Sequence, residues 1–178
     1  WSYRNKGLLR NLGGFFVKPS TERLKVLLGM QKDPFDCYHY LDKIHEAYNI
    51  QPIYFFLVAG YSSRYDKNIT PRNPAMKELI AKHAARYDIG IHPSWNSNGN
   101  FRRLSKEIKT LEKIGNKKIK KSRQHYIYYE MPGTFEDLVN AGIEEDYSMG
   151  YGSINGFRAS VASPFYWYHL INEEVTSL

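Results

Sequence analysis

The hydrophobic positions of the chain form short uninterrupted runs that alternate with longer stretches of helical spacing. Three runs predict strands, and they lie near residues 53–58, 88–92 and 119–127. The first run has no polar alternation, which predicts a strand buried on both faces, as in a parallel sheet. In the longer stretches, apolar residues follow the three-to-four-residue spacing of one helical face. These stretches predict helices over residues 36–48, 75–84, 103–114 and 134–141.

The spacing of the predicted strands indicates the fold class. Their starts lie roughly 32–34 residues apart, which fits successive β-α units. We therefore expect an α/β fold in which the three strands are adjacent and parallel with helices outside, as a sheet or a barrel. Two further strands are predicted at 145–149 and 155–159, and a helical or frayed segment at 166–174. No repeat and no domain boundary interrupts the pattern, so we predict a single domain over residues 1–178.

The composition is that of an ordinary globular domain, and it narrows the set of partners. Of the 178 residues, 42% are hydrophobic and 24% are charged, which is enough for one hydrophobic core. The net charge is +7, and basic residues cluster at 102–103 and 117–121. Because no helix-turn-helix, zinc-finger or RNA-recognition motif accompanies this charge, we expect a solvated basic edge, attractive to anionic glycans, and no nucleic-acid partner. No apolar run of about 18 residues occurs, so we expect no membrane span, and the lone Cys37 argues against a disulfide framework.

Two of the predicted strands deliver a histidine at their carboxyl ends. His92 closes the second strand and is followed by Pro93, which has no N–H to continue a ladder; His125 lies near the end of the third. Functional side chains of parallel sheets and barrels gather at this edge, so the two imidazoles could bind one metal ion, for which zinc is suited. The alternative is that each histidine is a hydrogen-bonded cap of its strand. The remaining histidines lie in helical patterns and are predicted to be surface or half-buried residues: His39, His45, His83 and His169.

A series of short motifs resembles the polysaccharide deacetylases of the NodB-homology type, which are related to carbohydrate esterase family four. Residues 33–36, a helix, and the strand "PIYFFL" resemble the helix and "TFF" strand of that family. The order of the later motifs extends the resemblance over nearly all of the chain, to a bacterial branch with phrases such as "GIHPS", "SRQH", "DYTMGY" and "GFRAGT". Here these motifs fall at residues 90–96, 122–126, 146–151 and 156–159.

The resemblance implies a distorted (β/α) barrel that removes N- or O-acetyl groups from a polysaccharide or cell-wall glycan with a divalent metal, most often zinc. It implies that His92 and His125 are metal ligands. It also implies that Arg123 lies beside this site and acts in catalysis by orienting a carboxylate. Because Trp95 follows His92 in the same loop and Arg158 belongs to the Gly-Phe-Arg motif, we expect both to contact the sugar; the alternative for Trp95 is that it plugs the end of the barrel. In the family the ligands are one aspartate and two histidines, with a second aspartate as general base.

The chain departs from this pattern in three places. Asn96 stands where the second histidine of the motif is expected, and an amide oxygen is a poor ligand for zinc. The aspartate pair is expected ahead of Trp1, with Asp33 and Asp36 as the fallback, and a late Leu-x-His motif is expected after Leu178. We therefore expect a domain that is incomplete at both ends. A catalytically inactive barrel that binds glycan is the alternative, and the sequence leaves both the cytoplasm and the cell envelope open as locations.

Overall fold

A computed structural model describes residues 13–14, 16–17, 20–32, 36–60 and 64–178 of the chain. The chain divides into two compact units, Trp1–Gln51 and Pro52–Leu178. The first unit contains helices α2 (Thr21–Leu27) and α3 (Tyr38–Ala47), and α3 coincides with the helix predicted over 36–48. The fallback residue Asp33 and the segment 1–7 lie outside the described residues. The single domain over 1–178 stays a prediction.

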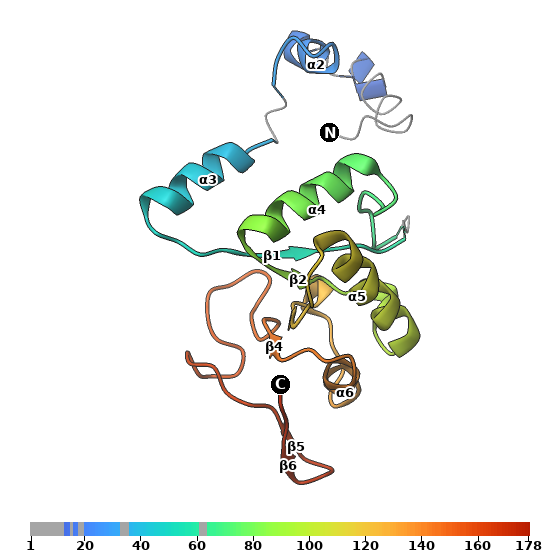
Figure 1. Cartoon of the computed structure of the whole chain (residues 1–178), viewed down its shortest axis with the longest axis vertical. Helices are drawn as coiled ribbons and strands as arrows, with labels where there is room; N and C mark the ends of the chain where they lie inside the picture. Colours follow the sequence, from blue (N-terminus) through green and yellow to red (C-terminus); the bar gives the residue numbers. More distant parts are fainter. Residues whose placement is uncertain (1–12, 15, 18–19, 33–35, 61–63) are drawn as a thin grey trace. The chain divides into compact units, whose positions relative to one another are not determined.

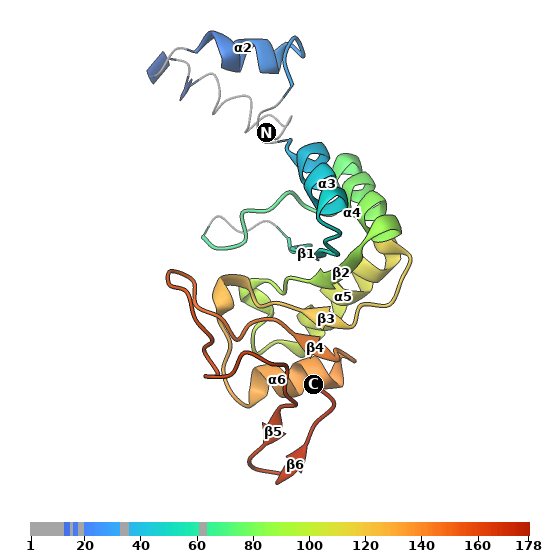
Figure 2. The same ribbon diagram turned by 90° about the vertical axis from the view of Figure 1, so that its left-hand side faces the viewer.

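The second unit is an α/β fold built on a parallel sheet (Figure 1). Its strands are β1 (Ile53–Phe56), β2 (Asp88–Ile91), β3 (Lys121–Ser122) and β4 (Glu145–Asp146), in the spatial order β1-β2-β3-β4. Each neighbouring pair runs parallel, and Figure 2 shows the strands one beside the next. Helices α4 (Pro74–Arg86), α5 (Phe101–Gly115) and α6 (Gly133–Asn140) alternate with them along the chain. The predicted adjacent parallel strands are therefore confirmed.

Polar residues fix the ends of the two long helices. The side chain of Asn73 accepts a hydrogen bond from Ala75 N (2.9 Å) at the start of α4. Pro74 suits the first position of this helix because it has no N–H that would need a partner. Asn100 caps α5 in the same way through Arg103 N (3.1 Å). At the other end of α5 the left-handed residue is Asn116, with φ of 50°, and the helix includes the glycine predicted to stop it.

The hydrophobic core lies on the face of the sheet that α4 and α5 cover. Ile89 and Ile91 of β2 point to this face, and Ile80 and Leu111 of the helices meet them there. The prediction that β1 is buried on both faces is wrong for the other face of the sheet, where Phe55 is only half-buried. The rest of the core comes from the same strands, from the helices and from the segments between them: Phe56, Val58, Ala84, Leu104, Ile108, Ile119, Phe135, Leu138, Ile143 and Leu178.

Gly90 of β2 leaves room for an aromatic ring on that other face. A Cβ atom at this position would lie 2.5 Å from Cε1 of Phe55 and 2.8 Å from the carbonyl oxygen of Lys121. The Phe55 ring in turn contacts the ring of Tyr147, with 5.4 Å between ring centroids. The glycine in "DIGI" is thus required by close packing across three neighbouring segments.

Several predicted elements of the last third of the chain are wrong. Strand β3 ends at Ser122 because Tyr126 and Ile127 adopt left-handed φ angles of 60° and 54° and belong to a 3₁₀ turn, η2 (His125–Ile127). No strand forms over 155–159. The segment 166–174, predicted to be helical or frayed, is an antiparallel hairpin of β5 (Tyr168–His169) and β6 (Glu174–Val175).

The hairpin is held by a histidine that was predicted to be a surface or half-buried residue. His169 is buried, its Nε2 lies 2.8 Å from a carboxylate oxygen of Glu136, and its Nδ1 accepts a hydrogen bond from Asn172 N. His83 is buried as well, against the rings of Tyr54 and Phe56. Within the described part of the chain, no helix combines the length and the apolar character needed to cross a membrane.

Candidate active site

The structure brings His92 and His125 together at the carboxyl edge of the sheet. His92 directly follows β2, and its N–H still donates to Phe56 O (3.0 Å), after which Pro93 ends the ladder. His125 begins η2, three residues beyond β3. The two imidazole rings have centroids 4.9 Å apart and planes inclined by 56°. Both rings therefore lie within reach of one ligand.

Each imidazole is held through its Nδ1 atom. Nδ1 of His92 lies 2.6 Å from Arg123 O, and because a carbonyl oxygen can only accept, this nitrogen carries a hydrogen. Nδ1 of His125 lies 3.2 Å from Oδ1 of Asp66, whose carboxylate also accepts. The tautomer with hydrogen on Nδ1 is thus favoured in both rings, and it leaves Nε2 as the basic atom. Neither Nε2 has a hydrogen-bond partner among the described residues.

The surroundings of His92 keep its ring neutral. Burial and the neighbouring His125 lower the pKa of His92 from 6.5 to about 4, and the positive charge of Arg123 acts in the same direction. The carbonyl of Arg123 and the more distant Asp66 oppose this shift and are outweighed. At neutral pH, Nε2 of His92 is therefore an available lone pair.

Asp66 organises this side of the site, and the sequence analysis missed it. Its side chain is 1% exposed, and Oδ1 accepts a hydrogen bond from Trp95 N (2.9 Å) in addition to its contact with His125. Oδ2 accepts from Nδ2 of Asn96 (3.0 Å). Asn96 thus donates to the carboxylate that orients His125, a task that needs an N–H donor. Asp66 could have been suspected from its place in the loop after β1, at the same edge of the sheet.

One buried and one half-buried carboxylate, Glu107 and Asp146, brace the loops that carry the histidines. Glu107 of α5 accepts from the N–H (3.0 Å) and the hydroxyl (2.7 Å) of Ser94, two residues after His92, and burial raises the pKa of Glu107. Asp146 accepts from the hydroxyl of Ser122 (2.5 Å) and from N–H and hydroxyl of Ser148, and burial raises its pKa as well. The hydroxyl of Ser148 then accepts from Gln124 N (2.8 Å). These contacts fix the chain on both sides of the pair.

Aromatic rings surround His125. Trp95 is half-buried and stacks against Tyr65 and Tyr128, with centroid distances of 4.2 and 4.4 Å. Tyr126 is 60% exposed, stacks on His125 (4.3 Å) and meets Trp95 edge-on. The sequence analysis singled out Trp95, but the most exposed ring of this group is Tyr126. Its position directly after His125 is the feature of the sequence that could have identified Tyr126 as part of the site.

The two arginines named from the sequence lie differently. The backbone of Arg123 holds His92, and its exposed side chain places positive charge near both His92 and Asp146. The guanidinium of Arg158 lies 4.6 Å from the ring centroid of Tyr129. Among the described residues, no hydrogen bond, ion pair or ring contact joins Arg158 to either histidine of the pair.

The donor atoms suit a divalent metal, although the set is small. Histidines that bind metals usually donate their other ring N–H to a carboxylate or a backbone carbonyl, and both histidines do so here. In the described part of the chain, no group of three or more His, Cys, Asp or Glu side chains is arranged to hold an ion. The two Nε2 atoms are thus the candidate ligands, and zinc stays a prediction.

The lowered pKa of His92 predicts a loss of stability in acid. The unfolded chain takes up a proton on this residue near pH 6.5, whereas the folded chain resists until about pH 4. The unfolded state therefore binds more protons between these values, and the contribution is complete above pH 6.5 and lost as the pH falls toward 4. We expect wild type to lose about 2 kcal/mol more unfolding free energy than His92→Gln between pH 7 and about pH 4.5. Urea titrations with chelator present measure this difference; equal losses in both proteins would contradict it.

Comparison of the chain with protein-family models, with curated proteins and with solved structures found no match.

Proposed function

We propose that the chain is part of a metal-dependent deacetylase that hydrolyses acetyl groups from a polysaccharide or cell-wall glycan. The observation that supports this best is the pair of neighbouring imidazoles, each with Nδ1 anchored and Nε2 free, at the carboxyl edge of a parallel sheet. The proposal includes the finer fold, a distorted (β/α) barrel of the NodB-homology type, of which β1 to β4 form one side. The motif order described above gives independent support.

In this proposal each residue of the site has a separate role. His92 and His125 would hold the cation through Nε2. A bound divalent cation polarises the acetyl carbonyl and lowers the pKa of a bound water. Asp66 keeps the ring of His125 in one orientation and one tautomer. The permanently charged guanidinium of Arg123 favours a carboxylate, or negative charge developing on the acetyl group, beside His92.

The rings around His125 would receive the sugar. The exposed face of a pyranose is apolar, and an aromatic ring provides a flat apolar surface against which it can lie. Tyr126 is the most exposed ring of the group, and Trp95 supports it from the side. Arg158 would take part through the segment 156–159 only if that segment approaches the bound glycan.

A second function, glycan binding without hydrolysis, is favoured by one observation. The amide of Asn96 occupies the place of the second motif histidine and is committed to Asp66. An aromatic surface beside two histidines would bind a sugar equally well without a complete set of metal ligands.

Acetate release from defined glycans tests the proposal. We expect the full-length protein, in which the aspartate pair of the family would complete the ligand set, to release acetate from acetylated xylan or from N-acetylchitopentaose, to lose this activity in EDTA and to regain it when zinc is added back. Binding of either glycan with no acetate release would establish the non-hydrolytic alternative. If the protein neither binds these glycans nor releases acetate from them, both proposed functions are wrong.

A further inference from the structure

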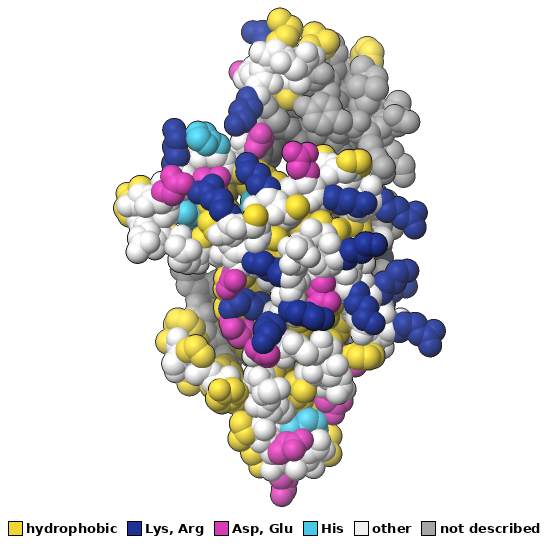
Figure 3. All heavy atoms as spheres, viewed as in Figure 1, with side chains coloured by type: hydrophobic (Ala, Val, Ile, Leu, Met, Phe, Trp, Pro, Cys, Tyr) yellow, Lys and Arg dark blue, Asp and Glu magenta, His cyan; other side chains and the backbone are white. Residues whose placement is uncertain are grey.

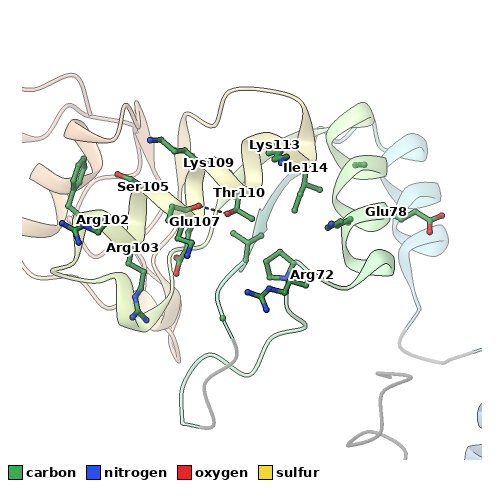
Figure 4. Close-up of a pocket in the computed structure, with 17 residues that line it drawn as sticks. Arg72, Glu78, Arg102, Arg103, Ser105, Glu107, Lys109, Thr110, Lys113 and Ile114 are labelled. Carbon is green, nitrogen blue, oxygen red and sulfur yellow. Dashed lines mark hydrogen bonds between the residues drawn. The ribbon is translucent and has the colours of Figure 1, made fainter.

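A groove lined by many positively charged side chains lies on the helical face of the second unit. An open groove of about 1460 Å³ is lined by α4, by α5 and by the loops at residues 58–60 and 71–72. Figure 3 shows Lys and Arg side chains gathered over these helices. Figure 4 shows Arg102, Lys109 and Lys113 on the α5 wall, whereas Glu78 of α4 points away from α5.

The cations of the α5 wall form a regular stripe. Arg102, Lys106, Lys109 and Lys113 follow the three-to-four-residue spacing of one helical face and extend about 16 Å along the helix axis. All four are exposed. Like charges at this spacing destabilise a helix. The stripe therefore lowers the stability of α5, which indicates that it has a role other than stabilising the helix.

These charges are not neutralised within the described part of the chain. The four residues of the stripe, and Arg72 and Lys77 across the groove, have no carboxylate of a described residue within 4.0 Å. The basic segment at 117–121 behaves differently. There Lys118 pairs with Glu112, and Lys120 pairs with Glu144 at 2.6 Å. Six cations without a carboxylate partner among the described residues therefore line this one groove.

We propose that this groove binds an acidic polysaccharide that carries carboxylates along its chain. A concave groove accepts a single extended polymer better than a flat membrane surface. The cations recur about every 5 Å along α5, a spacing comparable with the length of one sugar ring. Single-stranded nucleic acid is less suited, because such sites stack bases on several aromatic rings, and Phe101 is the one aromatic residue that lines this groove.

The groove is also joined to the candidate active site. Helix α5 begins shortly after η1 (Trp95–Ser97), and its Glu107 lines the groove while it holds Ser94, two residues from His92. A polymer in the groove would thus pass beside the loop that carries the histidine. The inference rests on the proposed function in one respect, namely that the polymer is a glycan.

Two triple variants of equal charge test the groove. Lys106→Gln, Lys109→Gln and Lys113→Gln together remove three charges from the stripe. Lys117→Gln, Lys118→Gln and Lys120→Gln remove three from the other basic segment, and glutamine is as good a helix former as lysine. Circular dichroism and thermal unfolding establish that both variants fold, and calorimetry measures their affinity for polygalacturonate oligomers, for neutral dextran and for a single-stranded oligonucleotide.

We expect wild type to bind polygalacturonate and not dextran. The stripe variant should bind polygalacturonate about tenfold more weakly, with a smaller salt dependence, whereas the affinity of the control variant should change less than about twofold. Equal losses in both variants, absence of binding by wild type, or tighter binding of the oligonucleotide through the same lysines would overturn the proposal. Acetate release and polygalacturonate binding are measured separately on wild type and on both triple variants, which separates the two proposals. If wild type releases no acetate but the stripe still selects the acidic glycan, the deacetylase proposal fails and the groove proposal stands.

Discussion

Replacing either histidine of the pair with alanine should reduce acetate release at least 100-fold, on the order of 3 kcal/mol of transition-state stabilisation. The reason is that each substitution removes one of the two free Nε2 atoms that would hold the cation. Binding of Co²⁺, followed by its visible absorption, should be lost in parallel. Both quantities are measured on His92→Ala, on His125→Ala and on wild type.

His39→Ala is the matched control for these variants. His39 is an exposed residue of α3 in the first unit, so its removal should change neither acetate release nor the Co²⁺ spectrum. Full activity in His92→Ala or His125→Ala would show that the pair is not a metal site. The two histidines would then be polar caps of their strands.

Gly90→Ala should lower the free energy of unfolding by about 2–3 kcal/mol, the cost of overpacking a tight interior position. The new methyl group would lie 2.5 Å from the ring of Phe55 and 2.8 Å from the backbone oxygen of Lys121. The ring can rotate away, but the oxygen belongs to the neighbouring segment, so the sheet itself would have to shift. Urea unfolding followed by circular dichroism measures the loss.

Gly133→Ala provides the comparison for this prediction. Gly133 is the first residue of α6, and a Cβ atom there meets nothing within 4 Å. Alanine is the better helix former, so this variant should be as stable as wild type or slightly more stable. A Gly90→Ala protein with unchanged stability would mean that the strands adjust freely at this point.

The parts of the fold that sequence could predict are those set by local periodicity. Strands β1 and β2 and helices α4 and α5 follow from the spacing of their apolar residues. The hairpin of β5 and β6 does not, because it depends on His169 meeting Glu136, 33 residues earlier in the chain. A long-range contact of this kind overrides the weak helical pattern of the segment.

The same limit applies to the site. His92 and His125 could be named because each lies at or near the end of a predicted strand, but Asp66 lies in a loop whose sequence shows no periodicity. The basic segment at 117–121 stood out in the sequence, yet three of its four lysines, Lys118, Lys120 and Lys121, pair with carboxylates. The charge that stays unpaired lies on α5, and only the tertiary structure distinguishes the two.

The two anchors of the histidine pair differ in how they tolerate sequence change. The partner of His92 is a main-chain carbonyl, which every amino acid at position 123 supplies. The partner of His125 is the carboxylate of Asp66, which a single substitution can remove. Genetic drift can therefore alter residue 123 without turning the first imidazole, whereas the second is inherited together with its aspartate. A lineage that abandons the chemistry would be expected to lose Asp66 before it loses the orientation of His92.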